Sequence, residues 1–341
     1  MSLKARFKKH LLEFKRPSGT SRGVLTTKPT WFIELYDSKA ASSVGTGECA
    51  LLPGLSYDDR PDYEAQLEKV CANPEAFLNS EALHEWPSIR FGLEMAHRDL
   101  IMGGKKHFYD SNFTVKNEPI PINGLVWMGE KHFMFDQIKE KLETGYTCIK
   151  LKIGAINFQD ELDLLGYVRK HFDAQTIEIR VDANGAFAPK DALEKLKRLS
   201  DFELHSIEQP IKANQWQAMA KLCASTPLPI ALDEELIGVI DKTKQAALLD
   251  AIQPQYCIFK PSLLGGFHAT EQWITLCKDR NIQWWNTSAL ESNIGLNAIA
   301  QWTATLNNPM PQGLGTGQLY TNNVEPHLHI EQGELYAPAQ D

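Results

Sequence analysis

The chain has 341 residues, of which 43% are hydrophobic and 23% charged, and its formal net charge is −8 at pH 7. This acidic balance argues against a nucleic-acid partner, which would need clustered Lys and Arg, and no apolar run approaches the ~18 residues of a membrane span. The length indicates a barrel-sized domain with a smaller companion.

The cysteines and the N-terminus indicate a reducing compartment. The six cysteines contain no CxxC pair, and the basic residues 1–15 lack the apolar core of a signal peptide. We therefore expect a cytoplasmic protein whose cysteines stay reduced and whose partners are small molecules. The sequence leaves open whether the chain forms a homo-oligomer.

Residues 1–115 are predicted to form an α+β unit. Residues 5–14 and 30–36 are typical of paired strands, and 45–52 of a third. Residues 15–29 are rich in Pro, Ser and Gly, which predicts a long mobile loop. Helical patterns follow at 62–72, 80–85 and 88–102. Strands followed by helices, without alternation, favour a unit separate from the rest.

From residue 119 the pattern alternates between strand and helix, which predicts a (β/α)8 barrel over residues 116–321. The final residues, 322–341, are expected to return to the N-terminal unit. The eight predicted strands are 120–128, 148–154, 177–184, 204–209, 230–234, 251–260, 283–288 and 313–317, with helices in the gaps, among them 157–172, 189–200, 215–225 and 267–281.

Charged residues recur at the ends of these strands. Lys150 and Lys152 share one face of their strand, because side chains alternate. From Lys152 the steps to the next four charged strand ends are 30, 26, 25 and 27 residues, about one strand and one helix each. Barrel enzymes keep their sites at this end of the strands. The four residues are Asp182, Glu208, Asp233 and Lys260.

Asp182, Glu208 and Asp233 form a candidate metal site. Three converging carboxylates repel one another unless a cation lies between them. Ligands that are all oxygen favour Mg²⁺, with Mn²⁺ as a substitute. Glu234 follows Asp233 directly and is an alternative third ligand.

Lys152 and Lys260 are candidate catalytic residues on strands that flank the metal set. A divalent ion bound to a substrate carboxylate stabilises the enolate that forms when the α-proton leaves. The base must be neutral, and lowering a lysine pKa from ~10.4 to ~7.5 corresponds to about 4 kcal/mol. Lys150, Lys260 and the metal would all disfavour the protonated form of Lys152.

These motifs resemble the muconate-lactonizing-enzyme subgroup of the enolase superfamily, over nearly the whole chain. The resemblance implies a capping domain at residues 1–115 and a mobile specificity loop at 15–29, where Arg22 would contact an anionic substrate. The strand-seven stretch 284–288 lacks the histidine of the mandelate-racemase pattern. The motifs are Lys150-x-Lys152, Asp182-Ala-Asn184, Glu208-Gln-Pro210, Asp233-Glu234 and Lys260-Pro-Ser262.

Within the subgroup, residues 47–54, 288–292 and 313–317 are most similar to the o-succinylbenzoate synthase branch of menaquinone biosynthesis. This similarity implies Mg²⁺-assisted removal of an α-proton by Lys152, then loss of a β-hydroxyl as water, with Lys260 stabilising the enolate. The substrate would be a small carboxylate. Its expected contacts are Lys150, Arg22, Asn184, Ser262 and Ser288.

Three alternatives stay open at this stage. In an N-acylamino-acid racemase, Lys152 and Lys260 would act as opposed bases. The subgroup's dipeptide epimerases carry Asp-x-Asp where this chain has Gly315-Thr316-Gly317, so an ammonium substrate would lack its counter-charge. A barrel that only binds a ligand, or a Schiff-base lyase, would leave the set of charged residues unexplained.

Overall fold

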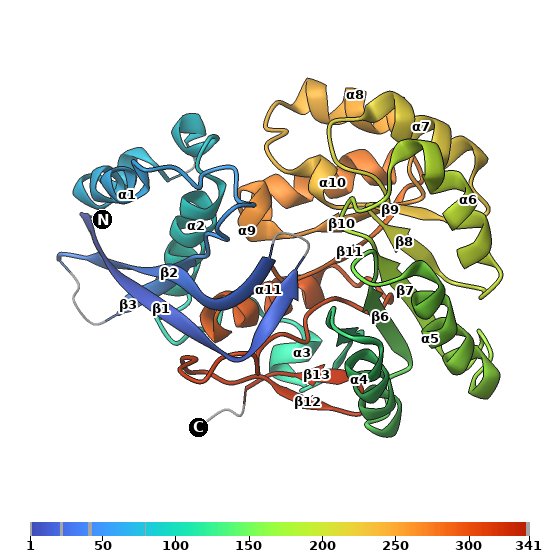
Figure 1. Cartoon of the computed structure of the whole chain (residues 1–341). Helices are drawn as coiled ribbons and strands as arrows, with labels where there is room; N and C mark the ends of the chain where they lie inside the picture. The colour runs from blue at the N-terminus through green and yellow to red at the C-terminus, as the bar shows by residue number, and fades with distance from the viewer. Residues whose placement is uncertain (1, 21–22, 40–42, 79, 339–341) are drawn as a thin grey trace.

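The structure is a computed structural model that describes residues 2–20, 23–39, 43–78 and 80–338. An antiparallel sheet and its helices form an N-terminal unit beside a larger parallel sheet wrapped by helices (Figure 1). Within the described residues, no helix is long and apolar enough to cross a membrane.

The N-terminal sheet has the order β1-β2-β3. Its strands are β1 (Leu3–Thr20), β2 (Gly23–Asp37) and β3 (Val44–Cys49). The prediction of a loop at residues 15–29 is wrong for its described part. The hairpin ladder continues past a bulge between Glu13 and Ser18 as far as the pair Thr20 and Gly23. Residues 15–17 and 23–27 are mostly exposed, and an exposed ribbon can be polar along its length, so composition alone suggested a loop.

Two α-helices and two short 3₁₀ turns pack on this sheet. They are α1 (Tyr63–Ala72), η1 (Pro74–Ala76), η2 (Glu81–Leu83) and α2 (Pro87–Ile101). The predicted helices at 62–72 and 88–102 are confirmed, whereas 80–85 contains only a 3₁₀ turn. Helix α2 approaches β3 so closely that a Cβ added at Gly47 would lie 1.9 Å from the Gly92 carbonyl oxygen. Glycine is therefore required at this crossing.

The larger sheet is parallel and has the order β11-β10-β9-β8-β7-β6-β5. Helices cover its outer face, as Figure 1 shows. The strands are β5 (Gly124–Val126), β6 (Cys148–Lys152), β7 (Glu178–Asp182), β8 (Ser206–Glu208), β9 (Ile230–Leu232), β10 (Tyr256–Phe259) and β11 (Gln283–Asn286). The helices are α4 (Lys131–Glu143), α5 (Phe158–His171), α6 (Pro189–Ser200), α7 (Trp216–Ser225), η3 (Glu234–Leu236), α8 (Lys242–Ile252), α9 (Pro261–Leu264), α10 (Phe267–Lys278) and α11 (Asn293–Thr305).

The predicted eighth strand, 313–317, is not a strand in the structure. Single bridges join Gln312 to Ile122 and Gly313 to Thr287, so this segment links the two edges of the sheet without a ladder. The predicted strand 120–128 is also divided. Its first part, β4 (Ile120–Pro121), lies outside the parallel sheet.

The C-terminal residues run along both units. Thr321 donates its backbone N–H to the Glu13 carbonyl of β1. Farther on, β12 (His329–Glu331) and β13 (Glu334–Tyr336) form a small sheet in which β13 pairs with β4. A short helix, α3 (Asn112–Val115), lies between α2 and β4 in the chain. The domain division into 1–115 with 322–341 and 116–321 stays a prediction.

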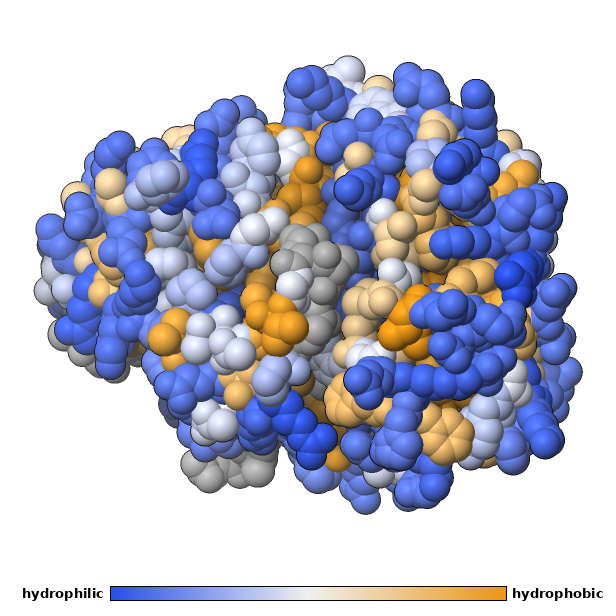
Figure 2. Space-filling model, viewed as in Figure 1, coloured by the Kyte–Doolittle hydropathy of each residue, from blue (hydrophilic) through white to orange (hydrophobic). Residues whose placement is uncertain are grey.

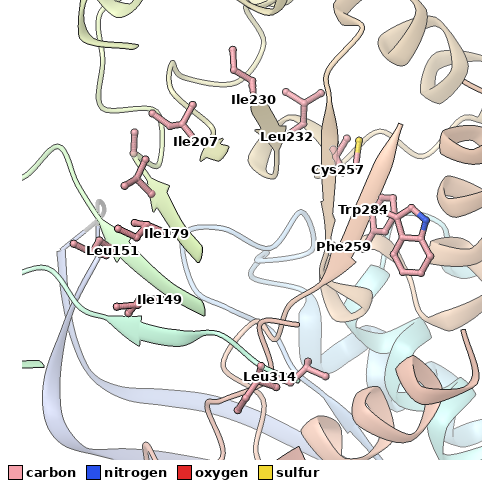
Figure 3. Close-up of a cluster of buried hydrophobic side chains, with 14 of the residues drawn as sticks. Ile149, Leu151, Ile179, Ile207, Ile230, Leu232, Cys257, Phe259, Trp284 and Leu314 are labelled. Carbon is pink, nitrogen blue, oxygen red and sulfur yellow. The ribbon is translucent and has the colours of Figure 1, made fainter. Parts of the chain in front are cut away.

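The two faces of the parallel sheet carry different side chains. Along β6, β7 and β8, apolar residues alternate with polar ones, so the apolar side chains share one face of the sheet. These apolar side chains belong to the largest buried cluster of the described chain (Figure 3). Ile149 and Leu151 of β6 continue to Ile179 of β7 and Ile207 of β8. The opposite face of the same strands is therefore free to hold charged groups.

Candidate active site

The predicted charged residues lie together at the C-terminal ends of consecutive strands. Lys152 is the register partner of Asp182, and Asp182 is the partner of Glu208. Asp233 directly follows β9, and Lys260 directly follows β10. Parallel register thus brings the five residues to one end of the sheet, as the sequence spacing predicts.

Lys150 and Lys152 reach the carboxylates from the same face of β6. The Lys150 amine donates to Glu208 Oε2 and lies 3.0 Å from Asp182 Oδ2. The Lys152 amine donates to Asp182 Oδ2 at 2.9 Å and to Asn184 Oδ1 at 2.7 Å. Asp182 is therefore shared by both lysines.

The second pair lies across the sheet. The Lys260 amine donates to Asp233 Oδ2, and both side chains are mostly buried. Glu234 accepts a hydrogen bond from Asn184 Nδ2 at 3.0 Å, so it faces the same group of residues. Asp233 and Glu234 both stay candidates for the third metal ligand.

Burial and crowding of like charges set the protonation of the carboxylates. Burial raises the pKa of Glu208 to about 8, with the Asp182 carboxylate adding to the shift and the Lys150 ammonium opposing it. Burial would also raise the pKa of Asp182, but Lys150 and Lys152 outweigh it and lower that pKa. Burial would lower the pKa of Lys150, but Asp182 and Glu208 raise it. The three groups therefore form one cluster of opposite charges.

The donor set fits a hard divalent cation. Glu208 Oε1 is buried and has no hydrogen-bond partner among the described residues, which leaves one carboxylate oxygen available. All candidate ligand atoms are oxygens. A cation beside Glu208 would stabilise its charged form, which burial disfavours. Within the described residues, no three His, Cys, Asp or Glu side chains are arranged as a metal site. The lysine amines bond the carboxylate oxygens instead.

A cavity of about 220 Å³ opens beside this cluster, with Lys150, Lys152, Asp182 and Lys260 in its wall. A larger cleft of about 620 Å³ lies between α2 and helices α8 to α10. We place the candidate site in the smaller cavity, because the charged cluster lies there. Residues 23–25, next to the end of the β1–β2 hairpin, form part of the cavity wall. Hydrophobic residues lie beside that part of the molecule in Figure 2.

The remaining predicted substrate contacts lie in different places. Asn184 and Ser288 line the cavity. Ser262 is fully buried outside the cavity wall and donates to Glu291 Oε1. Arg22 lies outside the described residues. Their roles as substrate contacts stay predictions.

Three polar residues of the cavity were missed by sequence reasoning. Asn123 is 4% exposed, and its Oδ1 accepts no hydrogen bond within the described chain. Thr287 Oγ1 is likewise buried without a partner, and Thr316 shares a 2.5 Å hydrogen bond with Ser288. Asn123 lies in the predicted strand 120–128 and has the same parity as Leu125 and Trp127, which also line the cavity. Strand alternation could therefore have placed it on the inner face.

Comparisons with known proteins give a consistent result. Residues 134–341 match the family model described as enolase C-terminal domain-like. The chain is 51% identical to an o-succinylbenzoate synthase from Desulfotalea psychrophila, over 95% of this chain and 96% of that protein. The crystal structure of MenC from the same organism has a TM-score of 0.87 and 46% identity, covering 99% of this chain and 100% of that one.

A more distant relative carries another activity in its name. The chain is 28% identical to an N-succinylamino acid racemase from Thermus thermophilus, over 81% of this chain and 75% of that protein.

Proposed function

The chain belongs to the enolase C-terminal domain-like family, and from that premise we propose that it acts as an o-succinylbenzoate synthase. It would dehydrate 2-succinyl-6-hydroxy-2,4-cyclohexadiene-1-carboxylate to o-succinylbenzoate in menaquinone biosynthesis. The observation that carries this proposal is the 51% identity over 95% of the chain to a relative of that name. The cluster of lysines and carboxylates at the sheet end supports it.

We assign the metal ligands as Asp182, Glu208 and Asp233 or Glu234. A bound Mg²⁺ would neutralise these carboxylates and stabilise negative charge on the substrate carboxylate. Lys150, which donates to Glu208 and lies 3.0 Å from Asp182, would hold both ligands in place.

Lys152 is the proposed general base and acid. Its Nζ would take the proton from the α-carbon, and the electron pair of that C–H bond would move toward the carboxylate. The C–O bond to the hydroxyl would then break as the diene becomes aromatic. Lys152 would return the same proton to the departing oxygen, which leaves as water.

Lys260 would stabilise the enolate from the opposite side of the cavity. Burial would lower its pKa, but Asp233 and Glu208 raise it, so Lys260 stays a cation in the structure. A fixed positive charge near the developing anion lowers the barrier without moving a proton.

We also propose that the sheet and segment 312–313 act as a degenerate (β/α)8 barrel that keeps this site at the strand ends. The six free cysteines agree with a cytoplasmic location. A homo-oligomeric state stays a prediction.

The alternative function is N-succinylamino-acid racemase. It is supported by the 28% identity to a relative of that name and by two lysines on strands separated by β7 to β9. Apart from Lys150, Lys152, Asp182 and Lys260, the polar residues of the cavity wall are uncharged, among them Asn123, Ser288 and Thr316.

The test uses the purified protein with Mg²⁺ and both substrates. Aromatic absorbance follows the diene acid, and ²H uptake from D₂O follows each enantiomer of an N-succinyl amino acid. We expect rapid dehydration of the diene acid. Racemization of the acylamino acid without any dehydration would replace the first function by the second.

A further inference from the structure

Leu290 has a strained backbone in the wall of the cavity that holds the charged cluster. Its φ angle is +63°, and among the described non-glycine residues with positive φ it is the only one with an apolar side chain. The left-handed region is uncommon for a bulky side chain, and such a conformation persists only where the surroundings hold it. A strained residue at this position therefore needs groups that fix its backbone.

Two hydrogen bonds hold the turn formed by residues 289–291, the Leu290 turn. The Tyr320 hydroxyl donates to the Leu290 carbonyl oxygen at 2.7 Å. The Ala289 backbone N–H donates to Glu291 Oε2, also at 2.7 Å. Tyr320 is 2% exposed and Glu291 is 0% exposed, so water competes little for either bond. The left-handed turn thus depends on two buried side chains.

Tyr320 also joins the Leu290 turn to the β1–β2 hairpin. The ladder between the two strands is interrupted directly after Glu13. There the Thr321 N–H donates to the Glu13 carbonyl oxygen at 2.9 Å, and Phe14 forms an antiparallel bridge with Tyr320. The ring centroids of Phe14 and Tyr320 are 4.7 Å apart. Tyr320 is therefore fixed to β1 by its backbone and ring, and to the Leu290 turn by its hydroxyl.

Both elements that Tyr320 joins form part of the cavity wall. Residues 23–25 of the hairpin segment and residues 289–290 of the turn line the cavity. The side chains of Leu25 and Leu290 pack against the same apolar cluster, to which Tyr320 belongs. Tyr320 itself is not among the described residues that line the cavity, so it acts on the cavity through these neighbours.

We infer that Tyr320 is a positioning residue, whose hydroxyl holds the Leu290 turn in the conformation that completes the cavity wall beside the hairpin. Molecules in which this turn relaxes have an incomplete wall and bind substrate less tightly. The apparent affinity then falls with the fraction of molecules that keep the turn. Lys152 and Lys260 lie at the ends of other strands, so the chemical step is little affected. The inference rests on the proposed function only for the substrate with which KM is measured.

A double-mutant cycle separates this role from general support of the fold. Tyr320→Phe removes the hydroxyl and keeps the ring beside Phe14. It should raise KM about 3- to 10-fold, the effect of one lost hydrogen bond, and change kcat by less than about twofold. Glycine adopts a positive φ without strain, so in the Leu290→Gly background Tyr320→Phe should raise KM by less than about twofold. An equal rise in both backgrounds, or no rise with Leu290 present, would overturn the inference.

Tyr336→Phe is the matched control. The Tyr336 hydroxyl also makes one hydrogen bond, to Glu334 Oε2 at 2.9 Å, and it lies on β13. Tyr336 is not among the described residues that line the cavity, so this variant should keep the KM of wild type. A rise in KM as large as that of Tyr320→Phe would overturn the inference, because the effect would not be specific to the Leu290 turn.

Amide hydrogen exchange follows the same cycle without an activity. Tyr320→Phe should speed exchange in residues 288–292 when Leu290 is present, and by much less in the Leu290→Gly background. Equal or absent acceleration in the two backgrounds overturns the inference even if the protein dehydrates the diene acid. The expected difference in a protein that never turns over the diene acid supports the inference and rejects only the proposed function.

Discussion

Glu208 is the residue on which the metal hypothesis depends most. Replacing it by Gln removes one anionic ligand, so Glu208→Gln should bind Mg²⁺ at least ~10-fold more weakly by calorimetry. Chelation with EDTA should abolish turnover of wild type, and Mg²⁺ or Mn²⁺ should restore it. Glu194→Gln, on an exposed side chain of α6, is the control. Full turnover after exhaustive chelation would reject the metal assignment.

Asn123 tests whether the uncharged part of the cavity recognises substrate. Its Oδ1 has no partner among the described residues, and a buried polar atom without a partner in the protein can be satisfied by a bound ligand or water. Asn123→Ala should therefore lower kcat/KM by about 10-fold or more, since a lost hydrogen bond costs about 1–3 kcal/mol. Its thermal stability should not fall, because no hydrogen bond within the protein is lost. A drop in Tm with unchanged kinetics would show a purely structural role.

At the scale of elements, Glu94 links α2 to the start of α10. It accepts hydrogen bonds from the backbone N–H groups of Phe267 and His268 at 2.8 and 3.1 Å. Burial nevertheless raises the pKa of Glu94 to about 7. Because the folded form binds the proton more tightly, this group's contribution to stability is present below about pH 4.5 and is lost as the pH rises to about 7.

Glu94→Gln should remove this dependence on pH. Between pH 5 and pH 8, wild type should lose roughly 2–3 kcal/mol more unfolding free energy than the variant. Urea unfolding of both proteins at the two pH values measures the difference. Parallel pH profiles would show that Glu94 titrates normally.

Strand parity and spacing predicted the elements that carry the charged cluster. Lys150 and Lys152 share a face because of a period of two, and Asp182 and Glu208 fall into register with Lys152. The ladder over residues 15–29 was not predictable, because residues 15–17 and 23–27 are mostly exposed and a mostly exposed ribbon shows no alternation. A local sequence pattern also does not show which distant segment a strand pairs with. For this reason β4 was predicted as part of a barrel strand, whereas it pairs with β13.

At the scale of the whole molecule, two features were predictable from the sequence: the family, and the change from strands followed by helices to alternating strands and helices. The closure of the parallel sheet was not predictable. Segment 312–313 touches both sheet edges by single bridges. Its position depends on long-range packing rather than on local propensity.

The central claim is that Lys152 both takes and returns the proton while Lys260 stabilises charge. The most direct measurement is dehydration of the diene acid by wild type, Lys152→Ala and Lys260→Ala, followed by aromatic absorbance with Mg²⁺ present. We predict that Lys152→Ala loses essentially all turnover and that Lys260→Ala retains activity lowered by ~10²–10³, the value of one charge-stabilising group. Dehydration by Lys152→Ala at a rate near that of wild type would contradict the account.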